Sequence, residues 1–163
     1  MKRILVTTLV LGTLVVASAT KVEKSAKIQG GTFEVGNSSS AMYGVSYDAS
    51  VIFKYVTLGV QLGLIGSSID IKNESKSLYG VETGVKLGYN FNVNGKGLGM
   101  FATYELFGGN ESVVTYGAGA EVEYVFDGGW SVGAKYSDKT LLINSTDTHT
   151  DNSTMQGYLG YHW

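Results

Sequence analysis

The 163-residue sequence contains no cysteine and no proline, and its only arginine is Arg3. Without cysteine, a domain of this length has to fold without disulfide bonds. Without proline, every backbone N–H remains a hydrogen-bond donor, which suits a β-sheet. Helical periodicity is missing beyond the N-terminal segment, whereas glycine is abundant with 23 residues. These features predict a single all-β domain.

The N-terminal segment predicts export. Lys2-Arg3 precedes the apolar residues 4–16, and Ala17-Ser18-Ala19 then supplies a small-x-small cleavage site. This order is typical of a secretory signal peptide, and the apolar run is shorter than the roughly 20 residues of a membrane-spanning helix. We therefore expect a signal peptide over residues 1–19 and a mature domain over residues 20–163. Loss of the two basic residues changes the formal charge from −2 to −4, which argues against a nucleic-acid partner.

Residues 78–91 show the pattern that dominates the mature chain. Apolar or aromatic side chains alternate with small and polar ones, so a β-strand here would have one apolar face and one polar face. The polar face combines glycine with ionised residues and an amide: Gly80, Glu82, Gly84, Lys86, Gly88 and Asn90. Such a face suits the crowded lumen of a narrow barrel whose apolar face is turned to lipid. Because the pattern recurs about seven more times, we predict an all-β fold, an eight-stranded antiparallel up-and-down transmembrane β-barrel.

Short turns and longer polar loops are expected to alternate along the chain. The expected turns are at 54–55, 94–95 and 127–129, and the expected loops are at 37–40, 66–77, 108–112 and 141–152. Outer-membrane barrels show the same asymmetry, with short periplasmic turns and longer extracellular loops. The first strand is expected over residues 28–35, after a loose segment at 21–27, with Phe33 and Val35 facing outward.

The Asn94-Gly95 turn predicts a strand register. These two residues supply the positive φ angles of a type I′ hairpin turn. Counting outward from the turn sets Tyr89 opposite Met100 and Glu105 opposite Gly84. The alternation independently assigns Tyr89 and Met100 to the outer face, so turn chemistry and facing agree.

The inward-facing charged residues are expected to form an ion network that plugs the lumen. Its members are Asp48, Glu82, Lys86, Glu105, Glu121, Glu123 and Lys135. A three-residue turn at 127–129 with a glycine in the left-handed region would set Glu121 opposite Lys135 as an ion pair. Acid–base catalysis by these carboxylates is the alternative, but an eight-stranded barrel has room only for its own side chains.

Neither histidine fits a catalytic or metal-binding pattern. His149 lies in an expected polar loop, and His162 is expected to face inward near the periplasmic rim. The two are far apart in the sequence and there is no cysteine, so no metal-ligand spacing is present. We expect no catalytic residue, no metal site and no cofactor.

Aromatic residues gather near the expected strand ends. They comprise Phe53, Tyr55, Tyr89, Phe91, Tyr124, Phe126 and Trp130, together with Tyr161 and Trp163 at the C-terminus. Amphipathic rings sit well at the headgroup level of a membrane. The rings near the short turns are therefore expected to form a periplasmic aromatic girdle.

Two segments resemble a known family. The final strand Tyr158-Leu159-Gly160-Tyr161-His162-Trp163 looks like the C-terminal signature of bacterial outer-membrane barrels, and Gln29-Gly30-Gly31-Thr32-Phe33 resembles the opening strand of the OmpX/Ail group. The resemblance implies that the barrel assembly machinery recognises the last strand through Tyr161 and Trp163. It also implies a monomer in the outer membrane of a Gram-negative cell, in contact with lipid and lipopolysaccharide.

The expected function is that of a surface-exposed structural or adhesion-type barrel, because a rigid barrel would present polar loops to an extracellular receptor. Three alternatives remain open from the residues: a narrow porin-like pore for small solutes, a lipid-modifying outer-membrane enzyme, and a soluble periplasmic ligand-binding barrel.

Overall fold

The computed structural model describes residues 21–36, 38–71, 74–92, 96–110, 113–143 and 148–163. The expected signal peptide at residues 1–19 and the Asn94-Gly95 turn lie outside these ranges. The side chains of residues 69–71, 74–76, 143 and 148–149 are also outside the description.

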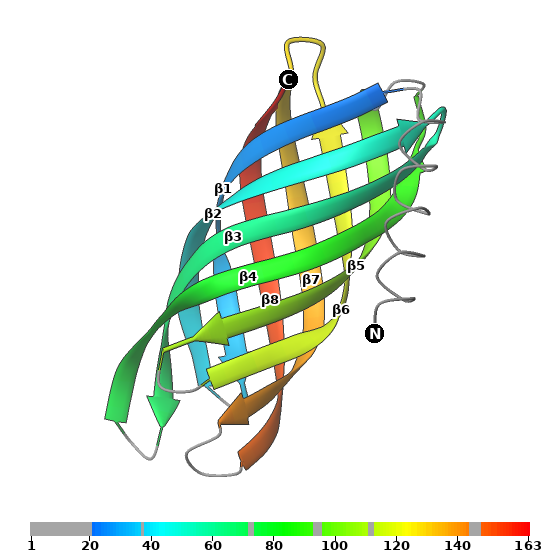
Figure 1. The fold of residues 1–163 in the computed structure, drawn as a ribbon. Helices are drawn as coiled ribbons and strands as arrows, with labels where there is room; N and C mark the ends of the chain where they lie inside the picture. Colours follow the sequence, from blue (N-terminus) through cyan, green and yellow to red (C-terminus); the bar gives the residue numbers. More distant parts are fainter. Residues whose placement is uncertain (1–20, 37, 72–73, 93–95, 111–112, 144–147) are drawn as a thin grey trace, which may run out of the picture.

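Eight antiparallel strands form a closed barrel (Figure 1). They are β1 (Lys21–Val35), β2 (Ser38–Phe53), β3 (Val56–Ile71), β4 (Glu74–Asn90), β5 (Gly97–Gly109), β6 (Val113–Val125), β7 (Trp130–Ile143) and β8 (Thr148–His162). Each strand pairs with the next in sequence, and β8 pairs with β1 to close the sheet. The predicted fold class is therefore confirmed. Within the described ranges, no helix is long and apolar enough to cross a membrane.

The barrel has two distinct ends. One end, called the turn end here, carries the connections β2–β3, β4–β5 and β6–β7 together with the C-terminal Trp163. The other, called the hairpin end, carries the remaining four connections. In Figure 1 the turn end lies at the top, where the C-terminus is marked.

The predicted turn at 127–129 is confirmed. The Phe126 N–H donates to the Trp130 carbonyl at 2.7 Å, and Gly129 has a φ of 85° in the left-handed region. This turn sets Glu121 opposite Lys135 in the backbone register, as expected.

The predicted β4–β5 register is also confirmed. Tyr89 lies opposite Met100, and Gly84 lies opposite Glu105. The expected two-residue turn at 54–55 is present as well, and Lys54 adopts a φ of 58° there.

The expected long loops at the hairpin end are wrong. The polar segments predicted as loops at 37–40, 66–77, 108–112 and 141–152 largely continue the strands: β2 begins at Ser38, β3 runs to Ile71, and β8 begins at Thr148. His149 therefore lies in a strand, opposite Leu142, and not in a loop. The reason is that serine, threonine and asparagine also suit the water-facing side of a strand, so polarity alone does not end pairing.

The expected facing of the first strand is also wrong. β1 begins at Lys21, and residues 21–27 are paired with β2 rather than loose. Phe33 points into the barrel and is buried, and Val35 packs partly buried beside it. Pairing on both edges, with β2 and β8, fixes this parity, because a shift of one residue would turn Lys27 towards the outside.

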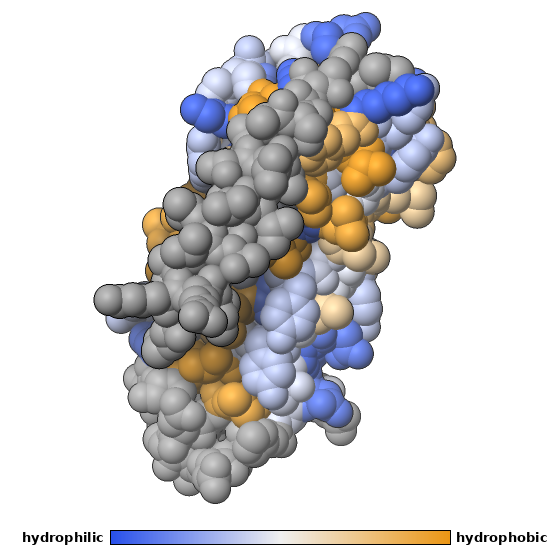
Figure 2. All heavy atoms as spheres, turned by 45° about the vertical axis from the view of Figure 1, so that its right-hand side comes forward, coloured by the Kyte–Doolittle hydropathy of each residue, from blue (hydrophilic) through white to orange (hydrophobic). Residues whose placement is uncertain are grey.

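The polarity of the two barrel faces reverses towards the hairpin end. On the outer face of β7, the apolar residue Val132 and the aromatic residue Tyr136 are followed by the charged residue Asp138. On its inner face, Lys135 is followed further along by the buried apolar residue Leu141. Over most of the barrel the outer wall is apolar, and Figure 2 shows hydrophobic residues of this wall below the polar residues at the top of the view. Beyond this wall the sheet continues with an apolar interior and a polar exterior, as in a soluble protein.

Candidate functional site in the barrel interior

The structure places all seven charged residues of the expected network inside the barrel. Asp48, Glu82, Lys86, Glu105, Glu121, Glu123 and Lys135 are each at most 6% exposed. Lys27 and Lys139, which the sequence interpretation did not include, are buried among them. The nine residues form two clusters along the barrel axis, which are described in turn.

The cluster nearer the turn end is centred on Lys27. Its ammonium lies 2.9 Å from Asp48, 2.8 Å from Glu121 and 3.3 Å from Glu123. Lys86 lies 3.0 Å from the same Asp48 oxygen and 3.8 Å from Glu121. Three carboxylates thus share two lysines. Because each lysine contacts more than one carboxylate, this is a network and not a set of independent pairs.

Tyr158 contacts two members of this cluster, Glu121 and Lys27. Its hydroxyl donates to Glu121 at 2.5 Å, and the Lys27 ammonium lies 4.2 Å from its ring centroid. Gly133 stands directly opposite on β7, and a Cβ there would overlap the phenol of Tyr158. Glycine at position 133 on the inner face therefore has a packing cause, because it leaves room for the side chain of Tyr158.

His162 connects the cluster to the rim of the turn end. Its ring nitrogens lie 3.1 Å from Glu123 and 3.7 Å from Glu23, and its Nε2 is also 3.1 Å from the Ser131 hydroxyl. His162 faces inward, as expected from the sequence. Protonation of this ring would supply a further cation to the acid-rich side of the cluster.

The second cluster, called the quartet here, consists of Glu82, Glu105, Lys135 and Lys139. Lys135 lies 3.2 Å from Glu82 and 2.8 Å from Glu105, and Lys139 lies 2.9 Å and 2.7 Å from the same two residues. Ser137 donates a further hydrogen bond to Glu105 at 3.0 Å. Two acids and two lysines in a closed ring balance each other's charge.

The expected ion pair between Glu121 and Lys135 is wrong, although the backbone register that suggested it is correct. Lys135 reaches across the lumen to Glu82 and Glu105, and Glu121 contacts Lys27 and Lys86 instead. In a narrow barrel, long side chains from non-adjacent strands meet at the axis. Cross-strand pairing rules describe neighbours on an open sheet and do not include these contacts.

An apolar cluster closes the interior at the hairpin end. Its members are Phe33, Met42, Ile65, Leu78, Phe107, Val113 and Leu141, all buried. Two small cavities flank the charged clusters, about 20 Å³ beside His162 and about 10 Å³ beside Phe33. A cavity of that size has room for about one water molecule. Neither of these two cavities has room for a solute larger than water.

The alternation of inward-facing polar residues in the sequence could have identified Lys27 and Lys139. Alternate positions from Glu23 through Lys27 to Gln29 are all polar, and Lys139 continues the inward parity of Lys135. The first pattern is hidden because outward-facing Lys24 makes the whole segment look polar.

Ring contacts link the aromatic residues at the turn end. Phe53, Tyr55, Tyr89, Phe91, Tyr124, Phe126 and Trp130 lie there, with Tyr161 and Trp163 from the last strand. Stacked or edge contacts join Tyr55 to Tyr89, Tyr89 to Phe91, Tyr124 to Phe126, and Trp130 to Tyr161, with centroids 4.9–5.5 Å apart. A second group of outward tyrosines, Tyr43, Tyr79, Tyr116 and Tyr136, lies nearer the hairpin end. The sequence interpretation did not identify this second group as a belt.

The chemistry available to the interior is limited. Every buried carboxylate of the two clusters contacts a lysine. Among the residues that the structure describes, no group of three or more His, Cys, Asp or Glu is arranged to hold a metal ion. Within the part of the chain that the structure describes, the charged side chains therefore fill the lumen with paired groups.

Comparison with known proteins gives a likeness in fold. No protein-family model matches the sequence, and no curated protein matches it. The structure is similar to the crystal structure of Neisserial surface protein A (NspA), with a TM-score of 0.55 and 10% sequence identity, over 88% of this chain and 97% of that chain. At this identity, the likeness extends to the eight-stranded antiparallel barrel itself.

Proposed function

We propose that the chain is an integral outer-membrane β-barrel that serves as a closed, surface-exposed scaffold of the adhesion type. The observation that carries the proposal is the apolar outer wall bounded by aromatic residues on both sides. On β4 this wall runs from Tyr79 to Tyr89, eleven residues inclusive. A tilted strand needs roughly 9–11 residues to cross a bilayer, and aromatic rings favour both membrane interfaces.

The packed interior favours a scaffold over a pore. Two charged clusters and an apolar cluster occupy successive levels of the lumen, and the flanking cavities measure about 20 and 10 Å³. Ions would have to displace buried, paired side chains in order to pass, which is costly.

The hairpin end is proposed to be the exposed surface. There the strands continue past the aromatic belt with outward-facing polar residues, namely Thr32, Glu34, Asp138 and Asp151. Strand pairing holds these side chains in fixed positions, so a receptor would meet a preformed polar surface. NspA is a surface protein by name, and its similar fold is consistent with this role.

Export and insertion complete the proposal. Residues 1–19 would direct secretion and be removed, and the last strand, ending in Tyr161 and Trp163, would be recognised by the barrel assembly machinery. Outer-membrane lipid and lipopolysaccharide would then surround the apolar wall of a monomeric barrel.

Membrane insertion can be tested by extraction and gel mobility. We expect the protein to require detergent, and to migrate faster without boiling than after boiling because a closed barrel resists the denaturing detergent. Recovery in the soluble fraction with one mobility in both samples would support a soluble periplasmic barrel and contradict the proposal.

Orientation can be tested with single cysteines, since the chain has none of its own. Asp151→Cys places a thiol on the outer face near the hairpin end, and Gly128→Cys places one in the exposed turn of the other end. On intact cells, a membrane-impermeant maleimide should label only the first, and both should react after lysis. Labelling of Gly128→Cys on intact cells would reverse the proposed orientation.

A further inference from the structure

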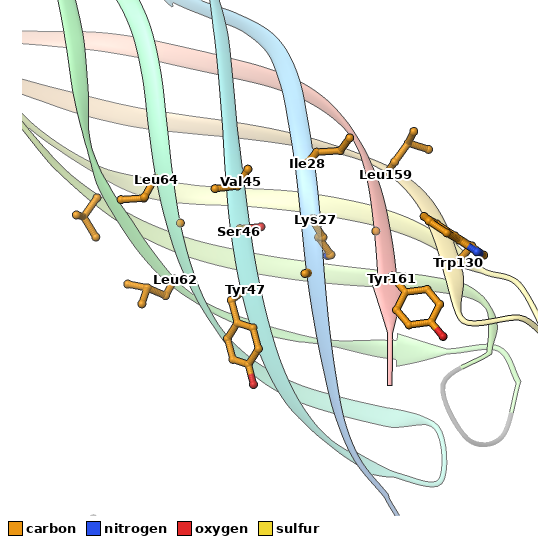
Figure 3. Close-up of a pocket in the computed structure, with 14 residues that line it drawn as sticks. Lys27, Ile28, Val45, Ser46, Tyr47, Leu62, Leu64, Trp130, Leu159 and Tyr161 are labelled. Carbon is orange, nitrogen blue, oxygen red and sulfur yellow. The ribbon is translucent and has the colours of Figure 1, made fainter.

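The outer wall contains a groove that crosses β8, β1, β2 and β3 on the turn-end half of the barrel. Its volume is about 680 Å³, within the range of small-ligand sites. The floor is formed where side chains are small, at Ala26, Gly63 and Gly160. Figure 3 shows Tyr47 and Tyr161 on either side of β1, with Ile28 and Leu159 farther along the same wall.

Ala26 accounts for the shape of the groove. It pairs with Tyr47 on β2 and with Tyr161 on β8, so its methyl group lies between two large rings. Towards the turn end, the Tyr47 and Trp163 rings approach each other across β1, with centroids 6.1 Å apart. The groove is thus apolar along its length and bounded by aromatic rings at the level expected for a headgroup layer.

Lys24 lies two residues before Ala26 on the outer face of β1. It is exposed, and its backbone hydrogen-bonds to Trp163 in both directions, at 3.1 and 2.9 Å. Its ammonium forms no ion pair with any residue that the structure describes. The outward carboxylates Glu34, Asp138 and Asp151 lie towards the opposite end of the barrel, and the exposed Asp127 at the turn end lies 3.7 Å from Lys96.

We propose that this groove binds one anionic phospholipid of the leaflet at the turn end. The acyl chain occupies the apolar groove over Ala26, and the phosphate lies beyond the Tyr47 and Trp163 rings at Lys24. Charge complementarity carries the choice of occupant: a second copy of this chain would bring an apolar wall, which leaves Lys24 without a partner. This inference rests on the proposed membrane location.

Competition between lipids tests the proposal in the intact barrel. Purified mature protein is mixed with equimolar phosphatidylglycerol and phosphatidylethanolamine in detergent micelles, and retained lipids are counted by native mass spectrometry. We expect one retained lipid per wild-type barrel, with phosphatidylglycerol preferred. Lys24→Ala should lower the preference by about fivefold, as expected for one lysine at an anionic headgroup.

Matched variants separate the groove from the rest of the wall. Ala26→Leu fills the groove and should remove retention of both lipids. Ala102→Leu makes the same change in a second hollow of about 640 Å³ on the wall, and Lys96→Ala removes another exposed lysine at the turn end. Both controls should retain lipid as wild type does, and unboiled gel mobility confirms that each variant is folded.

Three outcomes would overturn the inference. Lipid retention that is unchanged in Ala26→Leu would show that the groove is not the site. An unchanged preference in Lys24→Ala would show that the phosphate does not lie there. A wild-type dimer that dissociates in the Ala26→Leu variant would identify a second copy as the occupant. A protein that needs no detergent would instead contradict the proposed function itself.

Discussion

Glu121 and Lys135 face each other across β6 and β7, yet each side chain finds its charged partners on other strands. Lys135 contacts Glu82 and Glu105, and Glu121 contacts Lys27. Facing backbone neighbours are therefore not charge partners in this barrel. The charged side chains are grouped in two clusters at its axis, and we expect substitutions to behave according to cluster membership.

Lys27→Met should destabilise the barrel more than other lysine substitutions outside the quartet. It removes the cation that contacts Asp48, Glu121 and Glu123, all buried. Loss of one partner from a buried pair costs about 3–5 kcal/mol, and water entering the space would reduce that cost. Urea unfolding of the barrel in detergent micelles measures the change. The matched control is Lys24→Met, on the same strand but exposed, and an equal loss in both variants would contradict the role of the cluster.

A double-mutant cycle should reveal which carboxylate depends on Lys135. Lys135→Met leaves Glu82 and Glu105 with Lys139 as their shared cation. Adding Glu105→Gln should recover part of the lost stability, with a coupling energy of about 0.5–3 kcal/mol.

Adding Glu121→Gln to Lys135→Met should recover none of that stability, because Glu121 keeps its contact with Lys27 in the single variant. Both double variants are measured by the same urea unfolding. Recovery by Glu121→Gln and not by Glu105→Gln would mean that the facing pair is the real one and that the quartet is wrong.

The alternation of side chains predicted strand number, closure and the register of two hairpins, because facing repeats every two residues and turns such as 127–129 have specific backbone needs. It did not predict where the polar strands end, because Ser38 and Thr148 suit a water-exposed strand as well as a loop. Nor did it predict which charges meet. Contacts such as that between Lys27 and Glu121 depend on the curvature of the closed barrel, which no local pattern records.

Gly133→Ala should destabilise the barrel although it adds a single methyl group. The new Cβ would overlap the Tyr158 phenol, which donates to Glu121 and lies over Lys27. Overpacking of this kind typically costs about 1–3 kcal/mol. The control is Gly128→Ala in the exposed turn, where the nearest side-chain atom would be 3.9 Å away. Similar unfolding midpoints for the two variants would show that the side chains around Gly133 can shift to accommodate the added methyl group.

Wild-type protein in a planar bilayer should show no large steady conductance. The charged clusters and the apolar cluster around Phe33 and Phe107 fill successive levels of the lumen. Single-channel recording over a range of voltages measures this, with a known porin as the positive control. Reproducible unitary steps that change in size in Lys27→Met would establish a pore through this lumen and would favour the pore alternative.

Trp163 should matter more for assembly in the cell than for the stability of the finished barrel. Its backbone pairs with Lys24 through N–H and C=O groups that any residue provides, while its ring contacts Tyr47 and Tyr161 on the outer surface. Trp163→Ser therefore keeps the closing hydrogen bonds and removes the terminal aromatic that the assembly machinery is proposed to read. We expect a several-fold lower amount in the outer membrane, with synthesis and signal-peptide removal unchanged.

Refolding in vitro separates assembly from stability for this variant. Urea-unfolded Trp163→Ser should refold into detergent micelles to nearly the wild-type yield, as judged by the unboiled gel mobility, and Trp163→Phe should restore outer-membrane levels because it returns an aromatic terminus. If Trp163→Ser refolds poorly without any assembly machinery, its ring contributes mainly to stability through Tyr47 and Tyr161. If the variant reaches the membrane at normal levels, the last strand is recognised by something other than its final side chain.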